Sequence, residues 1–201
     1  MARDQAEAMR KLGINKAHIV GISQGGMIAQ YMAIDYPAMV DKLVLVVTMA
    51  KPNAMVQTVI GHWMQGLAGE NNYKELFIDM SEKAYSEKYL KKFRWLYPIL
   101  TSVGKPKDFT RFLIQAQACI EHNAYDALEK INCPTLIIGG CQDKIVGPDA
   151  SQETARKIKR AKLVMYPAYG HGVYEEAKDF NGRVLRFLSK KVKKDKGKDA
   201  K

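Results

Sequence analysis

The sequence predicts an α/β protein in which a block of helices interrupts a mostly parallel sheet. Short apolar runs alternate with segments of helical periodicity over residues 1–50 and again over 132–189. The run Leu43–Val47 is unbroken and rich in β-branched residues, which is typical of a strand covered by helices on both faces. Residues 51–131 lie between these blocks and contain no such run. This arrangement favours a parallel sheet of about four strands with a helical insertion.

The core elements follow one another along the chain. Helices are expected over residues 3–12, 24–36, 151–160 and 178–189, and strands over 17–21, 43–47, 134–139 and 162–166. Gly13 and Pro37 are good stops for the first two helices. We therefore expect residues 1–50 and 132–189 to form one α/β core.

The insertion at residues 51–131 has a composition of its own. It holds 11 of the 18 aromatic residues, including both tryptophans, and its apolar spacing is helical. We expect several helices that form a separate layer, with most of the aromatic side chains filling the core of that layer.

Composition favours one globular domain without a membrane segment. The chain has 201 residues, of which 47% are hydrophobic and 26% charged. No apolar stretch approaches the length of a transmembrane helix, and the N-terminus lacks a signal-peptide pattern. We expect a cytoplasmic protein that makes no contact with a membrane.

The net charge of +11 raises the question of nucleic-acid binding. The last 12 residues, KKVKKDKGKDAK, contain seven Lys and two Asp and therefore carry nearly half of that charge. With a single apolar residue, this tail is expected to be disordered and to aid solubility. No aromatic residue interleaves with its lysines, so the sequence does not favour nucleic acid as a partner.

Cysteine and histidine spacing gives no sign of a metal site. Cys119, Cys133 and Cys141 form neither a C-x-x-C motif nor an even set, so we expect free thiols in a reducing compartment. The four histidines include no pair at the spacing of helical metal ligands. No metal and no organic cofactor is implied.

The segment Gly21-Ile-Ser23-Gln24-Gly25 matches the pattern G-x-S-x-G between an expected strand and an expected helix. Such a turn holds its central residue in a strained conformation, and flanking glycines lack the Cβ atoms that would clash there. Ser23 is therefore a candidate nucleophile. The backbone N–H of Gln24 is a candidate oxyanion donor near a helix N-terminus.

Two further candidates each follow a strand in the second half of the chain. Asp143 comes after the strongest strand, where its carboxylate could orient a histidine, and Asp149 competes for that role. His171 stands between two glycines after the last strand and is suited to proton transfer near neutral pH. His18 is expected to be structural, whereas nothing marks His62 or His122, which lie in the insertion.

The order Ser23, Asp143, His171, each after a strand, resembles the α/β-hydrolase superfamily. The segments PTLIIGGCQDKIV and YPAYGHGVYEEAKDFNGRVLRFL resemble its acid loop and its histidine loop with the final helix. The resemblance implies that Ser23 is the nucleophile, Asp143 the acid and His171 the base. It also implies that residues 51–131 are a cap, or lid, and it is nearest to the esterase and enol-lactonase branch.

The chain departs from this superfamily at its beginning. Four strands are expected here, whereas the superfamily core has eight, and the loop that supplies a second oxyanion donor is not found in the sequence. The strand at 17–21 would then have an open edge that invites self-association.

Two functions remain open from the sequence. The first is a serine hydrolase acting on small esters, lactones or thioesters. The alternative is a catalytically impaired fragment that serves as an interaction module.

Overall fold

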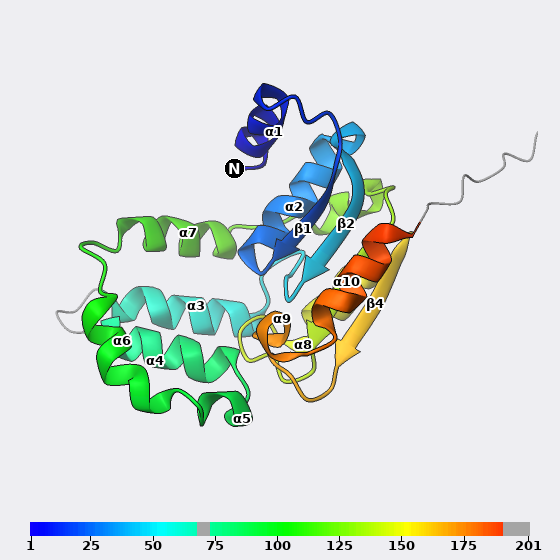
Figure 1. Cartoon of the computed structure of the whole chain (residues 1–201). Coiled ribbons are helices and arrows are strands. Elements are labelled where there is room, and N and C mark those ends of the chain that lie inside the picture. The colour runs from blue at the N-terminus through cyan, green and yellow to red at the C-terminus, as the bar shows by residue number, and fades with distance from the viewer. Residues whose placement is uncertain (68–72, 191–201) are drawn as a thin grey trace, which may run out of the picture.

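The computed structural model describes residues 1–67 and 73–190 and contains one parallel sheet (Figure 1). Its strands are β1 (Ala17–Ile22), β2 (Val40–Val46), β3 (Thr135–Gly140) and β4 (Ala161–Tyr166), hydrogen-bonded in the order β1-β2-β3-β4. The predicted α/β architecture with about four parallel strands is confirmed. Most of the predicted basic tail lies outside the described residues.

The side chains of β2 alternate between two hydrophobic clusters because successive residues of a strand point to opposite faces. Leu43 and Leu45 face one cluster, whereas Val44 and Val46 face the other, and all four are fully buried. The unbroken apolar run is therefore explained by a strand that is covered on both faces.

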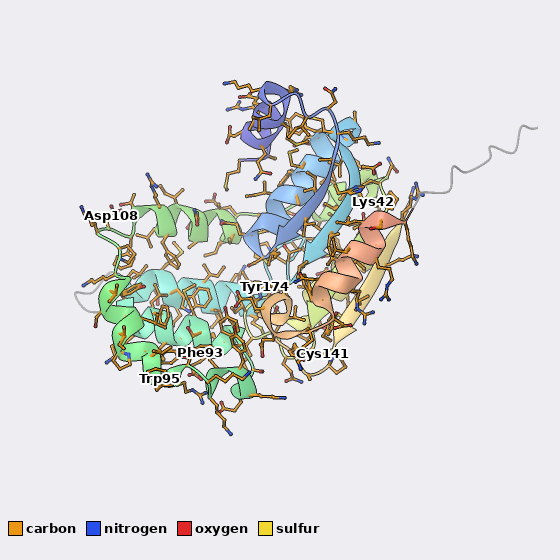
Figure 2. All side chains as sticks on the ribbon, viewed as in Figure 1. Lys42, Phe93, Trp95, Asp108, Cys141 and Tyr174 are labelled. Carbon is orange, nitrogen blue, oxygen red and sulfur yellow. The ribbon has the colours of Figure 1, made fainter. Side chains whose placement is uncertain are left out.

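Helices cover both faces of the sheet. On one face lie α1 (Ala2–Lys11), α2 (Gln24–Asp35), the 3-10 helices η1 (Pro37–Met39) and η3 (Tyr125–Lys130), and α8 (Pro148–Lys157). On the other face lie α9 (Val173–Glu176) and α10 (Phe180–Ser189). The buried amine of Lys42 donates to the carbonyl oxygens of Phe187, Leu188 and Lys190, so it caps the last turn of α10 (Figure 2).

A layer of helices gathers beyond the carboxyl ends of the strands (Figure 1). It consists of α3 (Ala54–Gly66), α4 (Tyr73–Ala84), α5 (Glu87–Leu90), the 3-10 helix η2 (Arg94–Leu96), α6 (Tyr97–Val103) and α7 (Thr110–Ile120). We call these elements the helical layer. Its own hydrophobic cluster includes Val56, Trp63 and Leu76.

Several element boundaries differ from the expected ones by two or three residues, and β2, for example, begins at Val40 and not at residue 43. Leu128 and Ile131, expected in the insertion, pack with Leu43 in the cluster of the sheet, so the helical layer ends near residue 120. Helix α8 begins at Pro148 and not at residue 151, because Gly147 turns the chain with a φ of 79° and proline favours the first helical turn. No helix of the described residues combines the length and apolarity that a membrane span requires.

Candidate active site

Ser23 lies in a strained turn between β1 and α2. Its φ of 50° and ψ of −120° are unusual for a residue with a side chain, and its N–H donates to the carbonyl oxygen of Val46 over 2.8 Å. The turn leads directly into α2, so the serine hydroxyl stands at the carboxyl edge of the sheet.

The glycines of this turn have different roles. A Cβ atom at Gly21 would lie 2.4 Å from the carbonyl oxygen of Gly25, so position 21 has no room for a side chain. A Cβ at Gly25 would meet no atom within 4 Å, which corrects the expectation that both flanking glycines prevent a clash. The second crowded position is Gly26, where a Cβ would lie 2.6 Å from Thr48.

The structure brings Ser23, Asp143 and His171 together from three separate loops. His171 Nε2 lies 2.9 Å from Ser23 Oγ, and His171 Nδ1 lies 2.8 Å from Asp143 Oδ2. The other carboxylate oxygen, Asp143 Oδ1, accepts the N–H groups of Ile145 and Val146 at 2.8 and 3.0 Å. Two backbone N–H groups of its own loop thus orient the Asp143 carboxylate, and its second oxygen contacts His171.

These contacts favour one tautomer of His171. A carboxylate in its charged form can only accept hydrogen bonds, so the contact with Asp143 fits a ring that carries its proton on Nδ1. The Nε2 atom is then free to accept the hydroxyl proton of Ser23. Asp143 is only 4% exposed and His171 7%, so water competes little for either contact.

The other candidates lie away from this cluster. Asp149 is exposed on α8, and His62 is exposed on α3. His18 pairs with Asp41 at 3.2 Å near the other end of β1. His122 is buried and contacts Gln30, so it does not reach Ser23.

The three cysteines are free thiols, as expected. Cys119 is buried, and burial raises the pKa of its thiol, partly offset by a hydrogen bond from Gln24. Cys133 and Cys141 are half-buried.

A cavity of about 360 Å³ opens above Ser23 and His171, between the core and the helical layer. Its lining is mostly apolar, with Met27, Ile60, Trp63, Phe77, Met80, Ala84, Phe112, Ala116, Ile145 and Val146. Polar atoms enter from Gln24, Ser81, Tyr85, Gln115, Cys119 and Tyr174. In Figure 2, Tyr174 lies where α9 meets the helical layer. Among the described lining residues, none is Asp, Glu, Lys or Arg.

Sequence reasoning missed the residues that join the helical layer to the loops that carry Ser23 and His171. The side-chain amide of Gln24 donates to the carbonyl oxygen of Gln115 at 2.9 Å and lies 3.4 Å from Cys119 Sγ. On the other side, the Tyr85 hydroxyl donates to Glu175 at 2.8 Å. Burial and this carboxylate raise the pKa of Tyr85, so it remains a donor at neutral pH. The sequence signal for these contacts was the acidic pair Glu175-Glu176, which follows His171.

Comparison with known proteins shows to which family this chain belongs. A family model described as "alpha/beta hydrolase fold" matches residues 1–178. The chain belongs to the α/β-hydrolase family. The resemblance inferred from the serine, aspartate and histidine loops is therefore confirmed.

Proteins that are similar to this α/β-hydrolase chain include named hydrolases. The 2-hydroxy-6-oxononadienedioate/2-hydroxy-6-oxononatrienedioate hydrolase of Pseudomonas sp is 29% identical over 194 residues, covering 90% of this chain and 66% of that protein. Of the solved structures, MGS-M2, an alpha/beta hydrolase enzyme from a Medee basin deep-sea metagenome library, superposes with a TM-score of 0.81 at 25% identity. That match covers 95% of this chain and 71% of the other.

The enol-lactonase of Burkholderia xenovorans LB400 shares the fold, with a TM-score of 0.82 at 21% identity. This match covers 94% of our chain and 72% of the lactonase. The α/β-hydrolase chain thus spans between 66 and 72% of the length of these three proteins.

Proposed function

We propose that this α/β-hydrolase is a serine hydrolase that cleaves small, uncharged esters, lactones or thioesters through an acyl-enzyme on Ser23. The observation that carries the proposal is the continuous path from Asp143 Oδ2 through His171 to Ser23 Oγ, with steps of 2.8 and 2.9 Å. Nucleophile, base and orienting acid are thereby within hydrogen-bond reach of one another.

The reaction follows from this path. Ser23 Oγ attacks the carbonyl carbon while His171 Nε2 takes the hydroxyl proton, and Asp143 stabilises the imidazolium that forms. When the tetrahedral intermediate collapses, the C–O or C–S bond to the leaving group breaks, and His171 returns the proton to that group. A water molecule then attacks the acyl-enzyme while His171 Nε2 takes one of its protons. The bond between the acyl carbon and Ser23 Oγ breaks, His171 returns the proton to Oγ, and the carboxylic acid leaves.

The proposed oxyanion donor is the backbone N–H of Gln24. As the first residue of α2, Gln24 has no acceptor for this group within the helix. The group adjoins the nucleophile, and the N-terminal end of the helix dipole favours negative charge there.

The cavity lining supports uncharged substrates. A carboxylate buried among apolar side chains without a cationic partner carries a large desolvation cost. The name of the Pseudomonas relative describes a dioate, which bears two carboxylates. The cavity above Ser23 offers no lysine or arginine among its described lining residues, so we propose that dicarboxylates are poor substrates of this chain. The helical layer that roofs the cavity would act as the cap that selects the acyl group.

Labelling by a fluorophosphonate probe tests the nucleophile. The wild-type chain should be labelled once, at Ser23, and Ser23→Ala should abolish labelling and lower p-nitrophenyl butyrate hydrolysis by roughly 10⁴-fold or more. His18→Gln serves as the control, since His18 pairs with Asp41 outside the cavity, and it should keep its activity. An unlabelled wild-type chain would indicate the non-enzymatic interaction module instead.

A matched pair of esters tests the substrate class. p-Nitrophenyl pentanoate and mono-p-nitrophenyl glutarate have acyl chains of equal length, but only the second ends in a carboxylate. We expect kcat/KM to favour the neutral ester by about 10²-fold, because the charged one must lose its hydration without gaining a partner. Equal values for the two esters would contradict an uncharged substrate class.

A further inference from the structure

The loop that carries His171 is attached to the helical layer as well as to the core. Its short helix α9 has only four residues and cannot hold its own conformation in isolation. On the core side, Val173 is fully buried in the cluster beneath α10. On the other side, the loop meets residues 84–86, which follow α4.

Three groups of contacts form this second attachment. The N–H of Gly172 donates to the carbonyl oxygen of Ala84 at 2.7 Å. The Tyr85 hydroxyl donates to Glu175, and the Glu176 carboxylate accepts both the N–H of Ser86, at 3.0 Å, and its hydroxyl. We call this set of contacts the latch.

The steric fit of the latch is close. A Cβ atom at Gly172 would lie 2.5 Å from the ring of Tyr85, so the residue after His171 has no room for a side chain. Ser86 Oγ also accepts the N–H of Tyr89 and thereby caps α5. Because that oxygen is an acceptor within the layer, its proton is available to Glu176.

We propose that Glu176 is a positioning residue, which acts through Ser86 and the latch to hold His171 at hydrogen-bond distance from Ser23. This inference rests on the proposed serine hydrolase mechanism and extends it. Neither Glu176 nor Ser86 lines the cavity, so replacing either side chain removes no group from the cavity lining. A base displaced by a fraction of an ångström loses the alignment that proton transfer requires. The helical layer would thereby control the position of His171 relative to Ser23 as well as the shape of the cavity.

The latch predicts a specific pattern in the kinetic constants. Glu176→Ala should lower kcat for p-nitrophenyl butyrate by about tenfold or more, while KM changes less than about twofold because the cavity lining is intact. Glu176→Gln should retain most of the activity, since its amide can still accept from the N–H of Ser86 and donate to Oγ. Glu129→Ala removes a carboxylate that pairs with Lys157 away from the site, and it should leave kcat unchanged.

A double-mutant cycle separates the latch from a general loss of stability. If Ser86 and Glu176 act as one unit, Ser86→Ala combined with Glu176→Ala should cost no more than Glu176→Ala alone. Additive losses in kcat, or an unchanged kcat in Glu176→Ala, would overturn the proposal.

A readout that does not require catalysis distinguishes failure of the latch from failure of the proposed function. In wild type, the Nδ1 proton of His171, held by Asp143, should give a sharp downfield proton resonance. Glu176→Ala should broaden that resonance, whereas Glu176→Gln and Glu129→Ala should preserve it. If the wild-type chain is not labelled by fluorophosphonate, the hydrolase mechanism fails, and the resonance still decides the latch. A resonance that is unchanged in Glu176→Ala would overturn the latch even in an active enzyme.

Discussion

Phe112 and Ile114 stand two residues apart on α7 and face different surroundings. Phe112 lines the cavity above Ser23, whereas Ile114 is 63% exposed to solvent. The pair therefore separates the effect of cavity shape from the effect of altering the helix.

Phe112→Ala should shift the acyl preference of the enzyme. Loss of the ring enlarges a cavity of about 360 Å³, so we expect kcat/KM to rise for p-nitrophenyl octanoate relative to the butyrate by about tenfold. Ile114→Ala should leave the ratio of the two esters unchanged. An identical substrate profile in both variants would show that the helical layer does not act as a cap for the acyl group.

Gly21→Ala and Gly25→Ala should have opposite consequences for stability. The new methyl group at position 21 would collide with the carbonyl oxygen of Gly25 and with the Cβ of Ala29, 2.7 Å away. We expect a loss of about 1–3 kcal/mol in the free energy of unfolding. Gly25 lies in the first turn of α2 with open space beside it, so Gly25→Ala should be neutral or stabilising by up to about 1 kcal/mol. Urea denaturation of the two variants provides the comparison, and a more stable Gly21→Ala would contradict the crowded turn.

The elements that could be predicted from the sequence are those with a local signal. The run Leu43–Val47 predicted β2 because a strand buried on both faces needs an unbroken apolar stretch. Ser23, Asp143 and His171 could be placed near one another because the carboxyl ends of parallel strands share one edge of the sheet. Because each of the three residues follows a strand, the sequence alone indicated that they come together in the folded chain.

The latch had only a weak local signal, the acidic pair that follows His171. Ser86 and Glu176 are 90 residues apart, and neither residue type is unusual where it stands. The packing partners of residues 128 and 131 had no local signal for a related reason. The apolar residues Leu128 and Ile131 have helical spacing whether they pack on the helical layer or on the sheet, and only the folded chain shows that the sheet is their partner.

The open edge of β1 predicts self-association. Within the described residues, β1 pairs with β2 alone, so the backbone groups of its other edge are available to a second chain. Val20, in the middle of this strand, is 45% exposed. Val20→Lys should reduce the association of the 201-residue chain measured by light scattering, because a charge on an edge strand opposes strand pairing. Leu185→Lys on α10 is the control for added charge and should not change it. A wild-type chain that remains a monomer at high concentration would refute the prediction.

A buried histidine should make the protein sensitive to acid. His122 packs against Tyr31 of α2 with the two rings nearly perpendicular, and its Nε2 atom lies 3.3 Å from Gln30 Oε1. The amide nitrogen of Gln30 donates to the carbonyl oxygen of Met49, so the amide oxygen is left to accept a hydrogen bond from an Nε2–H group of the neutral ring. Burial opposes the charged form and lowers the pKa of His122 to about 4, partly offset by the Met49 carbonyl.

The sign of the pH dependence follows from this lowered pKa. Between pH 6.5, the ordinary pKa of the group, and pH 4, the unfolded chain binds a proton at His122 that the folded chain does not. The contribution of the neutral His122 to the free energy of unfolding should therefore be complete above pH 6.5. It should decrease as the pH falls toward 4, with a total loss of up to about 3 kcal/mol from this group.

Urea denaturation at pH 7, 5.5 and 4 measures this dependence. His122→Gln keeps a donor near Gln30 but cannot be protonated, so its free energy of unfolding should fall less steeply with acid than that of the wild type. His62→Gln, which alters an exposed histidine of the helical layer, should follow the wild-type curve. If His122→Gln and the wild type lose stability in parallel between pH 6.5 and 4, acid sensitivity arises elsewhere in the chain and the buried neutral histidine is not its source.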